Sequence, residues 1–168
     1  MRALGVDLGT VRIGLALSDP GKVIASPHDT LPAGDVDAED WPRQIAAAIA
    51  QVARSNEVDT IVVGLPRSLA GRETAGASAA RRVAAALREI ADVTVELWDE
   101  RLSSVEAERM LIGAGQRRAA RRTARDRVAA AIILQAWLQD RGRRSANDSV
   151  ADPASTRHPV ERLRGTED

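Results

Sequence analysis

Three acidic residues that are far apart in the chain could act together on a metal ion. Asp7 lies within one apolar stretch, Glu100 follows another, and Asp126 stands near the start of an alanine-rich apolar segment. Carboxylates without a neighbouring histidine or cysteine are hard oxygen ligands, which suit Mg²⁺ or Mn²⁺. Two such ions can activate a water molecule and stabilise the leaving oxygen during phosphodiester cleavage. The three acids are therefore candidate metal ligands.

The charge on Asp7 also has a structural interpretation. An ionised carboxylate inside a sheet costs several kcal/mol unless it meets a cation, hydrogen-bond donors or water. Arg12 or Arg101 could supply that cation through a salt bridge. A chain with 24 acids also contains suggestive triples by chance. Asp99 precedes Glu100 and should point to the opposite face of its strand, so we expect it to be a surface or salt-bridged residue.

The elements that must position these acids follow from the apolar patterns. Short apolar runs predict strands at 4–8 and 13–17, joined by a tight turn, and a third at 22–30. Buried strands are predicted at 60–64 and 93–98. Helical spacing predicts a helix after Pro42 and further helices, at 72–90, 103–112 and 123–139.

This order predicts an α/β fold. Three early strands form an antiparallel meander, and strands that then alternate with helices imply a mixed sheet with parallel strands and helices on both faces. Ligands gather beyond the carboxyl ends of such strands, where Asp7 and Glu100 would lie. Positions 129, 130 and 133 share the helix face of Asp126, and two of them are alanine, so this face could approach the sheet closely.

Composition narrows the possible functions. The chain has 168 residues, no cysteine and two histidines, which excludes disulfides and thiolate zinc sites. Basic and acidic residues balance at 24 each, but residues 101–144 hold eleven arginines against four acids, 11 − 4 = +7. Such an excess is typical of a polyanion-binding face, although a solvated helix surface could produce it in a chain that uses arginine in place of lysine. No apolar run reaches membrane-spanning length and no signal pattern opens the chain, so we expect a cytoplasmic location.

Four segments resemble the blocks of a known family. They are GVDLGTVRIGLALSD, IVVGLPRSLAGRE, DERLSSVEAERML and DRVAAAIILQAWL, and together they extend over about 2–138. In this order they resemble the YqgF/RuvX family of Holliday-junction resolvases, which have a ribonuclease H-like fold. The resemblance implies a five-stranded mixed sheet, a divalent-metal nuclease site and, in bacteria, a role in maturing the 5′ end of 16S ribosomal RNA precursor.

The acids of the family carry over position by position. Asp7 matches the acid of the first strand, Glu100 the acid of the Asp-Glu-Arg block, and Asp126 the acid that opens the last helix. As a nuclease, the chain would use Asp7 to bridge two Mg²⁺ or Mn²⁺ ions, with Glu100 and Asp126 each completing one ligand shell. Departures from the family pattern, such as Ser103-Ser104 in place of Thr-Thr, leave these carboxylates untouched.

Several arginines are candidates for nucleic-acid contact. Arg12 in the hairpin and Arg101 beside Glu100 could hold a phosphate or pair with an acid. Arg72 could touch the backbone from the loop after Gly64, which could also be a plain connector. A basic loop is expected at 113–125, and because phosphate contacts carry little base information it predicts strong salt dependence. Its arginines are Arg117, Arg118, Arg121, Arg122 and Arg125.

Alternatives to catalysis stay open at this point. The chain could be a non-catalytic nucleic-acid or ribosome-binding module on the same fold. The DLGT segment resembles the phosphate-binding turn of actin-like ATPases, but these need a second domain that this chain is too short to contain. Four-way DNA junctions and precursor 16S ribosomal RNA both fit the chemistry, and symmetric junction cleavage would call for a homodimer. We expect one nuclease domain over 1–141, then a disordered polar tail over 142–168.

Overall fold

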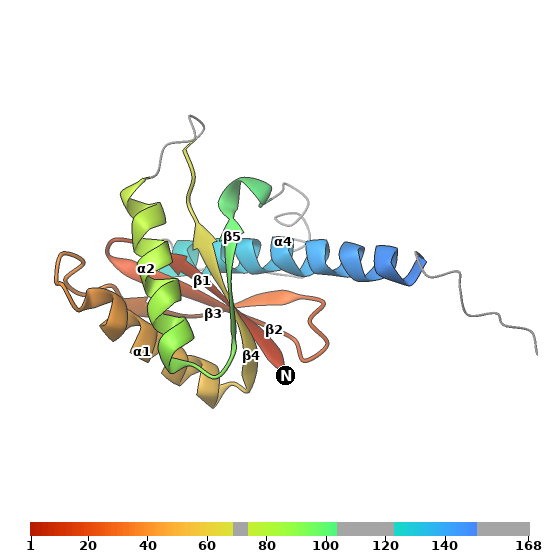
Figure 1. The fold of residues 1–168 in the computed structure, drawn as a ribbon, viewed down its shortest axis with the longest axis horizontal. Coiled ribbons are helices and arrows are strands. Elements are labelled where there is room, and N and C mark those ends of the chain that lie inside the picture. The colour runs from red at the N-terminus through yellow and green to blue at the C-terminus, as the bar shows by residue number, and fades with distance from the viewer. Residues whose placement is uncertain (69–73, 104–122, 151–168) are drawn as a thin grey trace, which may run out of the picture.

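The computed structural model describes residues 1–68, 74–103 and 123–150. The described elements are three strands followed by alternating helices and strands and a last long helix, in the order expected from the sequence (Figure 1). A 3₁₀ turn at Glu100–Leu102 follows the last strand. The remaining elements are β1 Arg2–Leu8, β2 Arg12–Ser18, β3 Ala25–Pro32, α1 Trp41–Ser55, β4 Val58–Leu65, α2 Ala75–Ile90, β5 Thr94–Asp99 and α4 Thr123–Val150.

The five strands form one mixed sheet in the order β3-β2-β1-β4-β5. The pairs β1–β2 and β2–β3 are antiparallel, whereas β1–β4 and β4–β5 are parallel. The predicted meander followed by parallel strands is therefore confirmed. Because β1 is the middle strand, a side chain near its carboxyl end is flanked by both β2 and β4.

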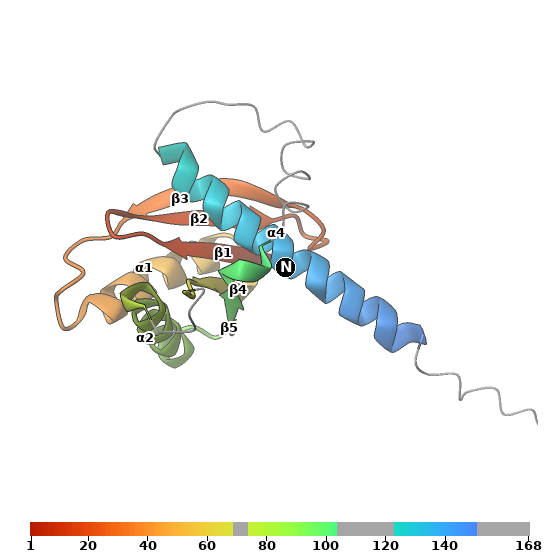
Figure 2. The ribbon, with the colours of Figure 1, turned by 90° about the horizontal axis from the view of Figure 1, so that it is seen from above.

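Helices cover both faces of the sheet, as predicted. Figure 2 shows α1 and α2 on one side of the strands and α4 crossing the other side. The α1/α2 side holds the larger apolar core, built on the large side chains that alternate along β1, β2 and β4. The α4 side is lined by smaller residues, among them Ala3, Ala16 and Ala25, which pack against Ala130 and Leu134. Small side chains on this face let α4 approach the sheet closely.

A buried glutamine fixes α4 against the sheet. Gln135 is fully buried, and its Oε1 accepts a hydrogen bond from the Ala25 amide at 2.8 Å. Its Nε2 donates to the Val23 carbonyl at 3.1 Å. Both ends of the amide are therefore satisfied, as a buried polar group requires. The two bonds tie the helix to the start of β3.

Two predicted boundaries differ most from the structure. The third strand begins at Ala25 and not at Lys22, because the Asp19 carboxylate accepts hydrogen bonds from the amides of Gly21, Val23 and Ile24 and holds this segment as a loop. The last helix continues beyond Gln139 to Val150, into the segment predicted as a disordered tail. There Arg144 forms an i,i+4 pair with Asp140 at 2.7 Å, and Arg141 lies over the Trp137 ring.

Other predictions lie outside the described residues. Of the helix expected at 103–112, only Ser103 is described, and it caps the end of the 3₁₀ turn. The predicted helix 72–90 is described from Ala75, with the Thr74 side chain accepting a hydrogen bond from the Ala77 amide as its N-cap. None of the helices in the described segments combines the length and hydropathy needed to cross a membrane.

Candidate active site

Asp7 stands near the carboxyl end of β1, on the face that α4 covers. Its partner across the antiparallel ladder is Gly14 of β2. Gly5, two residues earlier and hence on the same face, lies against α4, since a Cβ there would be 2.7 Å from the Leu134 Cβ. The Asp7 side chain is half-buried. The sheet thus directs a carboxylate beneath the first turns of α4.

Glu100 reaches the same area from β5. The strand ends at Asp99, and Glu100 opens the 3₁₀ turn that follows. Its Oε1 lies 2.8 Å from the position that a Cβ on Gly64 would take, and the Val6 carbonyl lies 3.4 Å from that position. The Glu100 side chain therefore folds back over β4 toward β1, into space that a side chain at position 64 would fill.

Asp126 is carried into the site by the first turn of α4. A Cβ on Gly14 would overlap the Asp126 main-chain carbonyl. The helix start can rest on β2 only because that position has no side chain, and Gly14 is the residue that pairs with Asp7. The Nε of Arg12 lies 3.6 Å from the Asp126 carboxylate. An acid in the first turn is also favoured by the helix dipole.

The electrostatics link Asp7 with each of the other two acids. Burial, together with the charge of Asp126, raises the pKa of Asp7 from 3.8 to about 6. Burial also raises the pKa of Glu100, with the charges of Asp7 and then Asp99 as further causes. Asp7 is therefore coupled to Asp126 on one side and to Glu100 on the other. The fold brings all three predicted acids to one end of the sheet.

The three carboxylates form two pairs, and each pair could hold one divalent cation. Within the described segments, no three acidic or histidine side chains stand close enough together to hold one ion. The coupling instead defines two pairs that share Asp7, one with Asp126 and one with Glu100. A cation between Asp7 and Asp126 would offset the cost of burying the Asp7 charge and the repulsion from Asp126, and a cation between Asp7 and Glu100 would do the same for Glu100. Oxygen donors of this kind suit Mg²⁺ or Mn²⁺.

Asp99 has the structural role expected of it. Its carboxylate accepts hydrogen bonds from the Arg101 Nε at 3.0 Å and Nη2 at 2.6 Å, and an Arg67 nitrogen lies 3.6 Å away. The hydrogen bond from Arg101 is the largest of the causes that lower the pKa of Asp99 to about 2. The fork-shaped contact fixes the Arg101 guanidinium against Asp99, the residue before Glu100.

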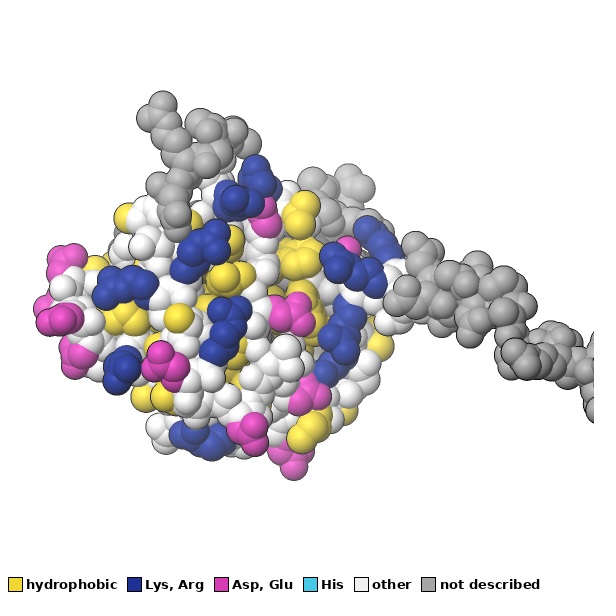
Figure 3. All heavy atoms as spheres, viewed as in Figure 1, with side chains coloured by type: hydrophobic (Ala, Val, Ile, Leu, Met, Phe, Trp, Pro, Cys, Tyr) yellow, Lys and Arg dark blue, Asp and Glu magenta, His cyan; other side chains and the backbone are white. Residues whose placement is uncertain are grey.

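Neither arginine considered as a partner for Asp7 pairs with it in these contacts. Arg12 pairs with Asp126, and Arg101 pairs with Asp99. Arg125 lies in the first turn of α4, and nothing is described of its side chain. The other predicted nucleic-acid contacts lie outside the described residues: Arg72, Arg117, Arg118, Arg121 and Arg122. On the face shown in Figure 3, basic side chains are interspersed with acidic ones and do not form a single patch.

Gly14 and Gly64 were not among the predicted site residues. Both stand inside apolar strands, where glycine weakens packing and often marks the close approach of another chain segment. That is the signal that could have found them. Each leaves room for one of the acids, Gly14 for Asp126 and Gly64 for Glu100.

The fold is shared with a protein of known structure. Thermus thermophilus RuvC, in a structure of its complex with a Holliday junction substrate, matches with a TM-score of 0.58 at 18% sequence identity, over 84% of this chain and 96% of that one. The fold class is therefore ribonuclease H-like, with Asp7 and Glu100 at the carboxyl ends of two strands and Asp126 in the first turn of the helix that crosses the sheet.

Curated relatives and a family match specify the group more closely. Proteins named "Putative pre-16S rRNA nuclease" from Nocardia farcinica and Myxococcus xanthus are 43% and 45% identical to this chain. The first alignment covers 83% of this chain and 78% of the relative, and the second covers 82% and 87%. Residues 1–140 match RuvX, described as Holliday junction resolvase. The chain belongs to the RuvX family, and the family match with its curated relatives identifies it as a nuclease.

Proposed function

We propose that the chain is an endonuclease that depends on a divalent metal and uses Asp7, Glu100 and Asp126 as its metal ligands. The observation that carries the proposal is the sharing of Asp7 between two carboxylate pairs, with its pKa raised to about 6 by burial and by Asp126. Bound Mg²⁺ or Mn²⁺ would supply Lewis-acid activation of water and of the leaving oxygen. Asp7 would bridge two ions, with Asp126 and Glu100 each serving one.

The surrounding residues would hold the substrate. Arg12 is half-buried beside Asp126, so its guanidinium can turn to a phosphate at the acids. Arg101 is held by Asp99 at the edge of the site and would contact the phosphate backbone of the nucleic acid. The arginines outside the described residues, Arg72, Arg117, Arg118, Arg121 and Arg122, together with Arg125, would add phosphate contacts without reading sequence.

We further propose precursor 16S ribosomal RNA as the substrate, cut near its 5′ end in the cytoplasm during assembly of the ribosome. The names of the curated relatives support this choice. A four-way DNA junction is the second candidate, because the family description and the RuvC complex both refer to one. Junction resolution would need two symmetric cuts and hence a homodimer.

The test compares both substrates with one set of proteins. The full chain, Asp7→Asn and the surface control Glu89→Gln are each given an RNA hairpin carrying the 5′ leader of 16S precursor, or a four-way DNA junction. Each reaction contains Mg²⁺, Mn²⁺ or EDTA. We expect the wild type and Glu89→Gln to cut the RNA with either metal and not in EDTA, and Asp7→Asn to bind without cutting.

Three other outcomes are informative. Cleavage of the junction alone would replace the RNA with the DNA substrate. Binding without cleavage by the wild type under every metal condition would favour the non-catalytic module. Equal cleavage by wild type and Asp7→Asn would remove Asp7 from the mechanism.

A further inference from the structure

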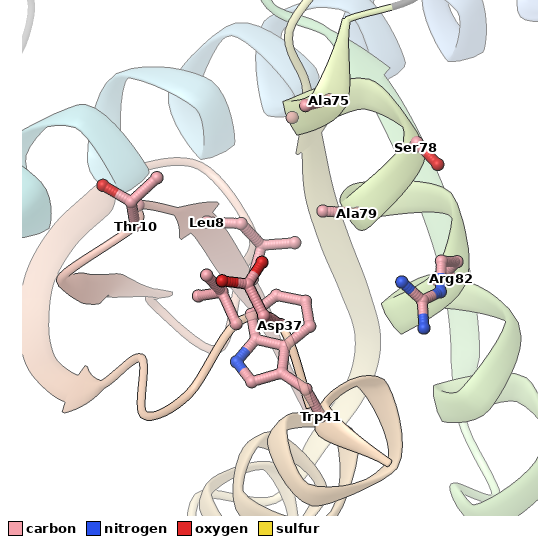
Figure 4. A pocket seen from close by; sticks show the side chains of 11 residues that line it. Leu8, Thr10, Asp37, Trp41, Ala75, Ser78, Ala79 and Arg82 are labelled. Atoms are coloured by element: carbon pink, nitrogen blue, oxygen red, sulfur yellow. The ribbon is translucent and has the colours of Figure 1, made fainter. Parts of the chain in front are cut away.

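A second concave site lies on the other side of the sheet from the acids. A pocket of about 330 Å³ opens between the β1–β2 turn, the loop before α1 and the first half of α2 (Figure 4). Its apolar walls are Leu8, Val36, Trp41 and Ala79. Trp41 is buried and held in place, because its indole N–H donates to the Ala33 carbonyl. The volume and the walls fit a flat, mainly apolar group of nucleoside size.

Two charged side chains complete this pocket. Asp37 comes from the loop before α1 and Arg82 from α2, and both are exposed. Figure 4 shows the Arg82 guanidinium projecting from α2 toward the space above Trp41, with the Asp37 carboxylate across from it. Both polar groups thus stand at the mouth of an apolar recess. A ligand with a flat face and hydrogen-bond donors on one edge matches this arrangement.

The pocket is joined to the candidate active site through β1. Leu8 lines the pocket and directly follows Asp7, and successive strand residues point to opposite faces. The turn residues Gly9 and Thr10, which also line the pocket, separate the two sites at the end of the strand. A polynucleotide that crosses this end with one phosphate at Asp7 can place a neighbouring base on the Leu8 side.

We infer that the pocket binds an unpaired guanine of the substrate strand, next to the phosphodiester that is cut. Unpaired bases are recognised by stacking on aromatic or guanidinium planes and by hydrogen bonds to their Watson–Crick edges. The guanine edge presents two adjacent donors, N1–H and N2–H, which match the two oxygens of the Asp37 carboxylate. Arg82 can stack on the base or hold its phosphate. The inference rests on the proposed function, because it takes the phosphodiester to lie at Asp7. It adds a base preference to an active site whose other proposed contacts are to the phosphates of the nucleic acid.

The experiment scans one RNA hairpin with a single-stranded 5′ leader, replacing each leader nucleotide in turn by an abasic residue. Cleavage is measured with the wild-type chain, and binding with Asp7→Asn, so that the pocket can be read even without catalysis. Ala79→Leu fills the pocket, and Ala85→Leu, at an exposed position of the same helix outside the pocket, is the matched control.

We expect one abasic position beside the cut to lower cleavage and binding about tenfold, the usual size of a base-stacking contribution. Ala79→Leu should lower cleavage and binding of the intact RNA by a similar factor. In this variant the abasic substitution should cause no further loss, whereas Ala85→Leu should behave as wild type. Replacing the guanosine at this position by inosine, which lacks the 2-amino group, should weaken binding of the RNA to Asp7→Asn. It should not weaken binding of the RNA to the double variant Asp7→Asn/Asp37→Asn.

Three results would overturn the inference. The first is an abasic effect of equal size in wild type and Ala79→Leu. The second is the absence of any sensitive position in the leader. The third is binding of guanosine 5′-monophosphate to the pocket while cleavage and binding of the RNA stay insensitive to every abasic residue, which would identify a site for a free nucleotide. Absence of metal-dependent cleavage would instead count against the proposed function, and the binding arm with Asp7→Asn would still report on the pocket.

Discussion

The main-chain carbonyl of Asp126 lies directly over Gly14, the residue that pairs with Asp7 across the β1–β2 ladder. The start of α4 and the end of β1 are therefore brought together by a missing side chain. Gly64 does the same for Glu100 on the other flank of β1. The spacing of the candidate metal ligands depends on these two glycines as much as on the acids.

Gly14→Ala should disable the site while leaving the chain folded. The added methyl group overlaps the Asp126 carbonyl, so the first turn of α4 must move away from Asp7. We expect a stability loss of about 1–3 kcal/mol from overpacking. A displacement of about 1 Å can cost a hundredfold in rate, so cleavage should fall by about that factor. The measurements are urea unfolding, cleavage rate and Mn²⁺ affinity.

Gly142→Ala is the matched control for this variant. Gly142 lies in α4, and a Cβ there would meet nothing within 4 Å. The control should keep its activity and gain up to about 1 kcal/mol of stability from helix propensity. Full activity and unchanged Mn²⁺ affinity in Gly14→Ala would show that the close approach of α4 is not needed.

Asp7→Asn should stabilise the chain in the absence of metal. Asp7 ionises near 3.8 when unfolded and near 6 when folded, so its raised pKa favours the unfolded state as pH rises between these values. A shift of this size corresponds to up to about 3 kcal/mol. Urea unfolding in EDTA should give the variant and wild type equal free energies of unfolding below pH 4. The variant should become the more stable protein between pH 4 and 6, and the difference should stay constant above pH 6. A variant that is less stable than wild type at pH 8 would refute the raised pKa of Asp7.

Much of the fold could be predicted from the sequence because the apolar patterns of the strands and helices are local. The order of the elements and the sheet type follow from them. The start of β3 does not, since it depends on three amides that the Asp19 side chain binds. The end of α4 was missed because polar residues past Gly142 continue the helix away from the sheet (Figure 1), where no apolar pattern is needed.

The acids of the site could be named from sequence, but their environment could not. Asp7 stands out as a charge within an apolar strand, Glu100 follows a strand end, Asp126 opens a helix, and the family resemblance matches all three. The pairing of Arg12 with Asp126 and of Arg101 with Asp99 depends on how the strand ends are arranged in space. The roles of Gly14 and Gly64 depend on which segment crosses each glycine, a long-range contact that local pattern does not contain.

Arg12→Gln should weaken nucleic-acid binding without abolishing the metal site. If Arg12 leaves Asp126 for a substrate phosphate, its loss removes one phosphate contact and lowers the slope of log affinity against log salt by about 1. Mn²⁺ affinity should stay equal or rise, because a cation that competes for Asp126 is gone. Fluorescence anisotropy across a salt series measures the slope.

Arg43→Gln is the control for that experiment. Arg43 lies on α1, where its exposed side chain pairs with Glu89 at 3.3 Å. Its removal should leave both the salt slope and the Mn²⁺ affinity unchanged. An Arg12→Gln protein with the wild-type slope would show that Arg12 serves only to pair with Asp126.

The sharing of Asp7 between two carboxylate pairs is tested most directly by titrating Mn²⁺ into wild type, Asp7→Asn and the control Glu89→Gln, by calorimetry at pH 5 and pH 8. Wild type and control should bind Mn²⁺ at pH 8 and bind it more weakly at pH 5, where Asp7 holds a proton. Asp7→Asn should lose more than the roughly 10–100-fold typical of an outer-shell partner. Equal affinity in wild type and Asp7→Asn at pH 8 would contradict the account.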